Sequence, residues 1–181
     1  VKVLNSIGVS QFITHAQLMG ITTWIHPERY GLALTLGGGE VKMIDIATAF
    51  SAFANVGEKV ELNPFLKIEN YKGEKLYEKN KIKKDLVINP GIAFIISDIL
   101  SDSFARRWAF GSHSALEVSG YKVAGKTGTT NDKRDNWTVG YTPDIMVATW
   151  VGNNDNSPMN QYVTSGVTGA APVWNKIMRY I

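Results

Sequence analysis

Apolar residues recur at helical spacing in two segments of residues 1–57. We expect the first helix to start at the N-cap Ser10, to run to Met19 and to stop at Gly20. The second helix is predicted over residues 40–56, directly after three glycines. Its apolar residues are Met43, Ile44, Ile46, Ala47, Ala49, Phe50, Ala52, Phe53 and Ala54. Because they leave little polar surface, this helix is expected to be buried on most sides.

Residues 58–118 combine a hairpin with a third helix. Alternating charges on both sides of a turn predict the hairpin over residues 64–79, with one solvated face. Asn89 and Pro90 are a cap and a first-turn proline, so they mark the start of the helix. An apolar stripe predicts that this helix faces a core, and its members are Ile92, Ile95, Ile96, Ile99 and Leu100. We expect a loop over residues 105–118.

Residues 119–181 change to the pattern of strands. The predicted strands, joined by short connections as an antiparallel meander, cover residues 122–129, 136–141 and 145–151. The third strand is an unbroken apolar run, so we expect burial on both of its faces. A loop over residues 153–169 leads to a last helix over 170–180. The helix presents to the sheet Val173, Trp174, Ile177 and Met178.

The order of these elements predicts an α+β fold in which helices flank both sides of an antiparallel sheet. No internal repeat and no clear linker divides the chain. We therefore expect one folding unit made of three successive parts. These are a helical part (residues 1–57), a hairpin and helix (58–118) and a strand meander with a C-terminal helix (119–181).

Composition excludes several classes of function. The 181 residues carry a net charge of +3, and their lysines concentrate in a mixed-charge stretch, which argues against nucleic-acid binding. There is no cysteine, so disulfides and thiolate metal sites are excluded. The three histidines show no metal-ligand spacing, and we expect no metal or cofactor. No run approaches the roughly 18 apolar residues that a membrane helix needs.

The glycines at 37–39 lack a following Lys-Ser/Thr pair, which favours tight packing over phosphate binding.

The tetrapeptide Lys126-Thr127-Gly128-Thr129 carries the most chemical information. It offers a cation, two hydroxyls and an uncrowded backbone to an anionic substrate. The same combination is a marker motif of penicillin-interacting serine enzymes. The alternative is a solvated lysine on an edge strand, with threonines present for their β propensity.

The surroundings of this motif resemble the transpeptidase domain of class A penicillin-binding proteins. The resemblance covers nearly the whole chain, and it is carried by residues 36–42, 47–57, 124–132, 135–137, 139–143, 150–153 and 168–174. It implies the C-terminal portion of a penicillin-binding, β-lactamase-like fold. It also implies extracytoplasmic placement at the bacterial cytoplasmic membrane, through an anchor outside this chain.

Two further motifs of that family have no counterpart here. The family's Ser-x-x-Lys serine becomes acylated and its Ser-x-Asn motif moves protons, but no Ser-x-Asn occurs in the sequence. Ser119 and Lys122 do fit Ser-x-x-Lys. Gly120 disfavours the helix that would bring the two side chains together, and strand alternation would separate them. We therefore expect a chain that begins just after the family's second motif, lacks the nucleophilic serine and is inactive alone.

The resemblance also implies a role for each residue of the tetrapeptide. Lys126 would supply positive potential, and Thr127 and Thr129 would bind the terminal carboxylate of a D-Ala-D-Ala stem peptide or a β-lactam. The backbone N–H of Thr129 would form half of an oxyanion hole. Gly128 would let the ligand lie against the strand.

Two other interpretations remain open. A serine β-lactamase or D,D-carboxypeptidase fragment would share the Lys-Thr-Gly strand. A non-catalytic module that binds cell-wall peptide or a protein would also lack the nucleophile. If a missing segment normally completes the domain, the chain alone should expose a strand edge and apolar helix faces.

Overall fold

The computed structural model describes residues 1–160, 165 and 168–181. Two helices, α1 (Lys2–Ile7) and α2 (Val9–Met19), open the chain and are separated by Gly8 at φ 85°. The expected cap at Ser10 is therefore wrong, because the chain turns at Gly8 and Ser10 lies inside α2. The stop at Gly20 is confirmed. Gly20 is left-handed (φ 117°), and its N–H donates to the carbonyls of Ala16 and Gln17.

Two 3₁₀ turns (Pro27–Arg29 and Leu32–Leu36) lead to α3 (Met43–Ala54), which begins three residues later than expected. Ala49 and Ala52 are buried, whereas Met43 and Ile44 are about half exposed. The expectation of burial on most sides is thus wrong for the first turn. The buried carboxylate of Asp45 ties α3 to the preceding segment, since it accepts bonds from Thr22 N and Thr22 Oγ1, both at 2.7 Å.

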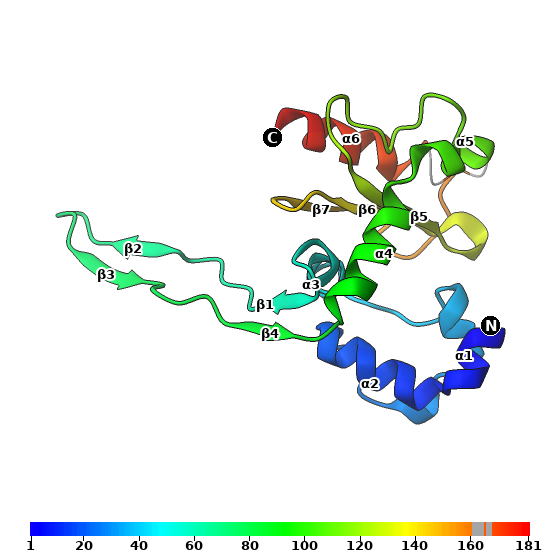
Figure 1. Ribbon diagram of the computed structural model, residues 1–181, viewed down its shortest axis with the longest axis horizontal. Helices are drawn as coiled ribbons and strands as arrows, with labels where there is room; N and C mark the ends of the chain where they lie inside the picture. Colours follow the sequence, from blue (N-terminus) through cyan, green and yellow to red (C-terminus); the bar gives the residue numbers. More distant parts are fainter. Residues whose placement is uncertain (161–164, 166–167) are drawn as a thin grey trace.

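The predicted hairpin is part of a long arm that projects from the body of the molecule (Figure 1). Strands β1 (Glu58–Val60) and β4 (Lys84–Leu86) pair at its base, and β2 (Lys67–Glu69) and β3 (Lys75–Glu78) pair farther out, both antiparallel. Every residue of β2 and β3 is exposed. Both faces of the hairpin are therefore solvated, rather than the one face expected from the sequence.

Helix α4 (Pro90–Ser101) starts as expected, with Asn89 Oδ1 accepting from the N–H of Gly91 at 2.9 Å. Its apolar stripe does not face a core: Ala93 is buried, but three members of the stripe are more than half exposed, namely Ile92, Ile95 and Ile99. Periodicity shows that a face is apolar without showing whether this chain covers it.

Helix α5 (Ser103–Phe110) replaces part of the loop expected over residues 105–118. It begins at Asp102, whose Oδ1 accepts from the N–H of Ala105 at 2.9 Å. The helix ends at Gly111, which has φ 78°. The expected loop is therefore wrong for residues 105–110, because the N-cap at Asp102 that starts this helix was overlooked.

The described residues form a three-stranded antiparallel sheet in the order β5 (Ala124–Thr129), β6 (Asp135–Tyr141) and β7 (Met146–Gly152). The meander is thus confirmed, close to its predicted bounds. In β7 the buried residues Val147 and Thr149 alternate with half-buried ones. The expected burial of this strand on both faces is wrong, because the two faces are covered unequally.

Helices cover both faces of this sheet, which confirms the α+β fold (Figure 1). On one face lies α6 (Ala170–Tyr180), whose fully buried Trp174 donates from Nε1 to Val147 O at 3.1 Å. On the other face α3 packs against β6 and β7, and α4 packs against β5. A hydrogen bond of 3.0 Å between Ser97 Oγ of α4 and Tyr141 Oη marks this second face.

Candidate functional site

The tetrapeptide lies in the second half of β5, where successive side chains alternate between the faces of the sheet. Lys126 is opposite Val139 and Gly128 is opposite Trp137, on the face of α3 and α4. Thr129 is opposite Asn136, which contacts the start of α6, so the side chains of Thr127 and Thr129 share the α6 face. The structure therefore brings both threonine hydroxyls to one face and places Lys126 on the other.

Within the described residues, β5 is an edge strand with no neighbour beyond it. The N–H of Thr130 donates inward to Asp135 O of β6 at 3.0 Å. Because neighbouring N–H groups in a strand point in opposite directions, the N–H of Thr129 points outward from the sheet. The carbonyl of Thr127 accepts a bond from Lys126 Nζ at 2.5 Å, which is consistent with the same outward direction. The edge thus offers backbone groups to a ligand.

The charge at this edge is supplied by Lys126. Its side chain is exposed, and among the described residues no carboxylate pairs with its Nζ. Thr129 is also exposed, whereas Thr127 is half-buried. A cation, an outward N–H and two hydroxyls can together hold a carboxylate and stabilise a developing oxyanion.

The connection after β5 is held by Asp135. Its Oδ1 accepts from Trp150 Nε1 of β7 at 2.8 Å, and its Oδ2 accepts from Thr130 Oγ1 at 3.3 Å. Asp132 is exposed, has φ 59° and lies 3.9 Å from Arg134. Asp135 therefore fixes the turn, whereas Asp132 lies at the surface near Arg134, so the two carboxylates do not act as a pair of acids.

Sequence reasoning missed Asn136, which joins the tetrapeptide to α6. It is fully buried, its Nδ2 donates to Thr129 Oγ1 at 3.0 Å, and its Oδ1 accepts from Ala170 N at 2.6 Å. The available signal was a polar residue directly opposite Thr129 in the predicted meander. Its second partner is 34 residues away in the sequence, so no local pattern indicates it.

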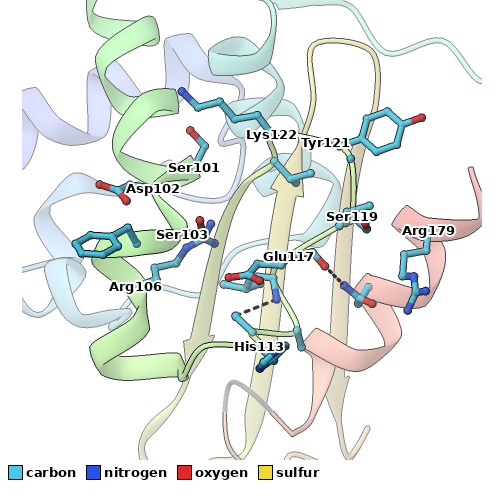
Figure 2. Close-up of a pocket in the computed structure, with 18 of the residues that line it drawn as sticks. Ser101, Asp102, Ser103, Arg106, His113, Glu117, Ser119, Tyr121, Lys122 and Arg179 are labelled. Atoms are coloured by element: carbon cyan, nitrogen blue, oxygen red, sulfur yellow. Dashed lines mark hydrogen bonds between the residues drawn. The ribbon is translucent and has the colours of Figure 1, made fainter.

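Ser119 and Lys122 are not brought together. Ser119 lies in a turn closed by the bridge between Val118 and Tyr121, with Gly120 at φ 83°. Lys122 Nζ pairs with Asp98 of α4 at 2.7 Å. Figure 2 shows the side chains of Ser119 and Lys122 pointing away from each other. This geometry supports the rejection of Ser119 as a nucleophile.

A cavity of about 1160 Å³ lies between α5, the loop before β5 and α6 (Figure 2). Its lining comes from α4, α5, the loop before β5 and α6, and it includes no residue of the tetrapeptide. Arg106 is partly buried there, and two of its nitrogens, Nε and Nη1, have no hydrogen-bond partner among the described residues. Desolvation lowers the pKa of the Arg106 guanidinium, against the opposing charges of Glu117 and Asp102. The candidate site is therefore an open strand edge and not an enclosed pocket.

The part of the chain that the structure describes holds no cluster of three potential metal ligands. Within the same residues, no helix combines the length and the apolar character needed to cross a bilayer.

Residues 22–179 match the family described as the penicillin-binding protein transpeptidase domain. Penicillin-binding protein 1A of Neisseria meningitidis serogroup A is 32% identical over 99% of this chain, and that of Clostridium botulinum is 31% identical over 99%. The chain spans about a fifth of the length of these relatives, 22% and 21% respectively.

Solved structures show the same fold. Penicillin-binding protein 1A from Haemophilus influenzae superposes with a TM-score of 0.83 at 22% identity, covering 99% of this chain and 32% of that one. PonA1 from Mycobacterium tuberculosis superposes with a TM-score of 0.75 at 22% identity, covering 96% of this chain and 50% of that one. A structure of that protein in complex with penicillin V is also similar. Because the family match covers residues 22–179, the chain belongs to the penicillin-binding protein transpeptidase domain family.

Proposed function

We propose that this chain supplies the Lys-Thr-Gly-Thr strand of a serine D,D-transpeptidase that cross-links the stem peptides of peptidoglycan. The observation that carries the proposal is the exposed edge of β5, where the outward N–H of Thr129 and the cation of Lys126 stand together. The named relatives are penicillin-binding proteins 1A, which favours a transpeptidase over a β-lactamase or carboxypeptidase.

The proposed reaction begins when a serine hydroxyl attacks the carbonyl carbon between the two D-alanines. The carbonyl oxygen gains negative charge, and the N–H of Thr129 donates to it as half of an oxyanion hole. The C–N bond then breaks, D-alanine leaves with the proton of the serine hydroxyl on its amine, and an acyl-serine remains. An amine of a neighbouring stem peptide attacks this ester, and the proton that this amine loses passes to the released serine oxygen.

Binding in this proposal depends on the terminal carboxylate of the donor peptide. The hydroxyls of Thr127 and Thr129 donate to it, and Lys126 supplies the positive potential that holds an anion at the edge. Gly128 leaves room for the ligand to lie along β5, where backbone groups bind it as an added strand. A β-lactam carries a comparable carboxylate and carbonyl, so it occupies the same place and leaves the serine acylated.

The serine itself is proposed to lie outside this chain. No Ser-x-Asn occurs in the 181 residues, and Ser119 lacks its lysine partner. The apolar residues Ile92, Ile95 and Ile99 on α4 are exposed, as expected if another segment covers them. The parent protein is this chain joined to a segment that carries the acylated serine. The isolated chain is then inactive, and the parent protein is held at the outer face of the cytoplasmic membrane by an anchor elsewhere.

The test is to incubate the parent protein with a stem peptide ending in D-Ala-D-Ala and an amine acceptor. Mass spectrometry should find free D-alanine and the cross-linked peptide in equal amounts. D-alanine without cross-linked product would instead indicate a D,D-carboxypeptidase. Neither product, from protein whose folding is verified by a cooperative melt, would contradict the proposal and favour a non-catalytic module.

A further inference from the structure

Asn136 of β6 makes two hydrogen bonds that together fix the orientation of its amide. Its Oδ1 accepts from the N–H of Ala170 at 2.6 Å, and its Nδ2 donates to Thr129 Oγ1 at 3.0 Å. Gly169 packs so closely that a Cβ there would lie 2.5 Å from Oδ1. A reversed amide would place its NH₂ against the N–H of Ala170, so that two donors would face each other. The amide is therefore held with its NH₂ toward Thr129.

This orientation decides the direction in which the hydroxyl of Thr129 donates. A hydroxyl has one proton and two lone pairs, and Asn136 Nδ2 occupies one of the lone pairs. No acceptor for the proton is present among the residues that the structure describes. Because Thr129 is exposed at the edge of the sheet, its proton is available to a ligand.

The N-terminus of α6 strengthens the arrangement. Ala170 is the first residue of this 11-residue helix, so its N–H lies at the positive end of the helix dipole. Hydrogen bonds in a chain polarise one another. The chain here runs from Ala170 through the buried Asn136 to Thr129, and its free end is a hydroxyl proton that favours an anionic acceptor.

We propose that Asn136 is a positioning residue, which holds the hydroxyl of Thr129 as a donor to the carboxylate of a stem peptide or β-lactam. It acts through Thr129, because it is 0% exposed and does not itself reach the edge. The assignment rests on the proposed function of the Lys-Thr-Gly-Thr strand. Asn136 lies outside that motif, and its amide determines the direction in which the hydroxyl of Thr129 donates.

The test is Asn136→Asp in the parent protein. Aspartate has the same shape and still accepts from Ala170 N, but it presents Thr129 with an acceptor in place of a donor. The hydroxyl then turns inward, away from the ligand. Acylation by a penicillin with a free carboxylate should slow by roughly 10- to 100-fold. Acylation by the methyl ester of the same penicillin, measured alongside, should change by less than about threefold.

A purely structural role would slow both ligands equally, and that result would overturn the proposal, as would unchanged rates with both. Thr129→Val provides a second check: adding Asn136→Asp to it should cause no further loss with the free acid, because the two residues act in series. Additive losses would contradict this.

If a melting curve shows that Asn136→Asp does not fold, Asn136→Ala takes its place. It should slow the free acid by about 3- to 10-fold and spare the ester, since the hydroxyl is then free to rotate. Equal slowing of both ligands again overturns the proposal. An unaltered parent protein that neither ligand acylates would contradict the proposed function itself, and this result is distinct from any effect of Asn136.

Discussion

Replacing Gly128 with alanine should separate the function of β5 from its folding. A Cβ at this position would meet Trp137 Cβ at 3.8 Å, an ordinary contact, and Gly128 is not among the glycines with positive φ. The folded state therefore accepts the methyl group. Because alanine has less conformational freedom than glycine in the unfolded chain, stability should rise by about 0.4–1 kcal/mol.

The same methyl group projects from the strand against which the ligand is proposed to lie. Displacing the ligand by even part of a methyl radius stretches its bonds to Thr129 and Thr127. The loss of one charge-assisted hydrogen bond is about 1.5–3 kcal/mol, which corresponds to roughly a 10- to 100-fold slower acylation. The assay is the second-order rate constant for acylation of the parent protein by a fluorescent penicillin.

Gly140→Ala is the matched control on the neighbouring strand. A Cβ there would lie 2.4 Å from Trp174 Cζ2 and 2.7 Å from the carbonyl oxygen of Ala124. Trp174 is fully buried, so the clash should cost about 1–3 kcal/mol of unfolding free energy in urea. The reasoning is refuted if Gly128→Ala acylates at the rate of the unaltered protein, or if it loses as much stability as Gly140→Ala.

Three further predictions concern stability. Thr138 Oγ1 is buried with no partner among the described residues, so Thr138→Val should raise the unfolding free energy in urea by about 1–2 kcal/mol; a decrease would contradict this. Burial raises the pKa of the Tyr141 phenol above 10.0, and its hydrogen bond with Ser97 opposes this shift. The neutral phenol therefore stabilises the fold at lower pH, and this contribution is lost as the pH rises through the raised pKa. Tyr141→Phe should flatten the alkaline decline, and an unchanged decline would exclude Tyr141 as its source. The isolated 181-residue chain exposes apolar residues on α4 and should bind the dye ANS; a sharp thermal transition without dye binding would refute this.

Several features that local sequence determines were predicted correctly, although the cap at Ser10 was not. Gly20 stops a helix because it adopts a left-handed backbone, and Asn89 starts one because its side chain accepts from Gly91. The meander followed from strands with short connections. The position of Lys126–Thr129 on the first of these strands followed in turn.

Two of the errors arose where a distant partner decides the outcome. The stripe on α4 has helical spacing, yet Ile95 is more than half exposed because nothing in the described chain covers it. Asn136 looked like an ordinary strand residue, because its role depends on Ala170 in a helix that comes later. Helix α5 was missed for a local reason, since the cap at Asp102 was overlooked.

The most direct test of the central claim is fluorescent-penicillin labelling of the parent protein and of the isolated 181-residue chain, compared after denaturation. We predict a covalent band on the parent protein alone, with the labelled peptide mapping outside these residues. Label on the isolated chain would contradict the account, because Ser119, the serine with Ser-x-x-Lys spacing, lies apart from Lys122, which pairs with Asp98 instead.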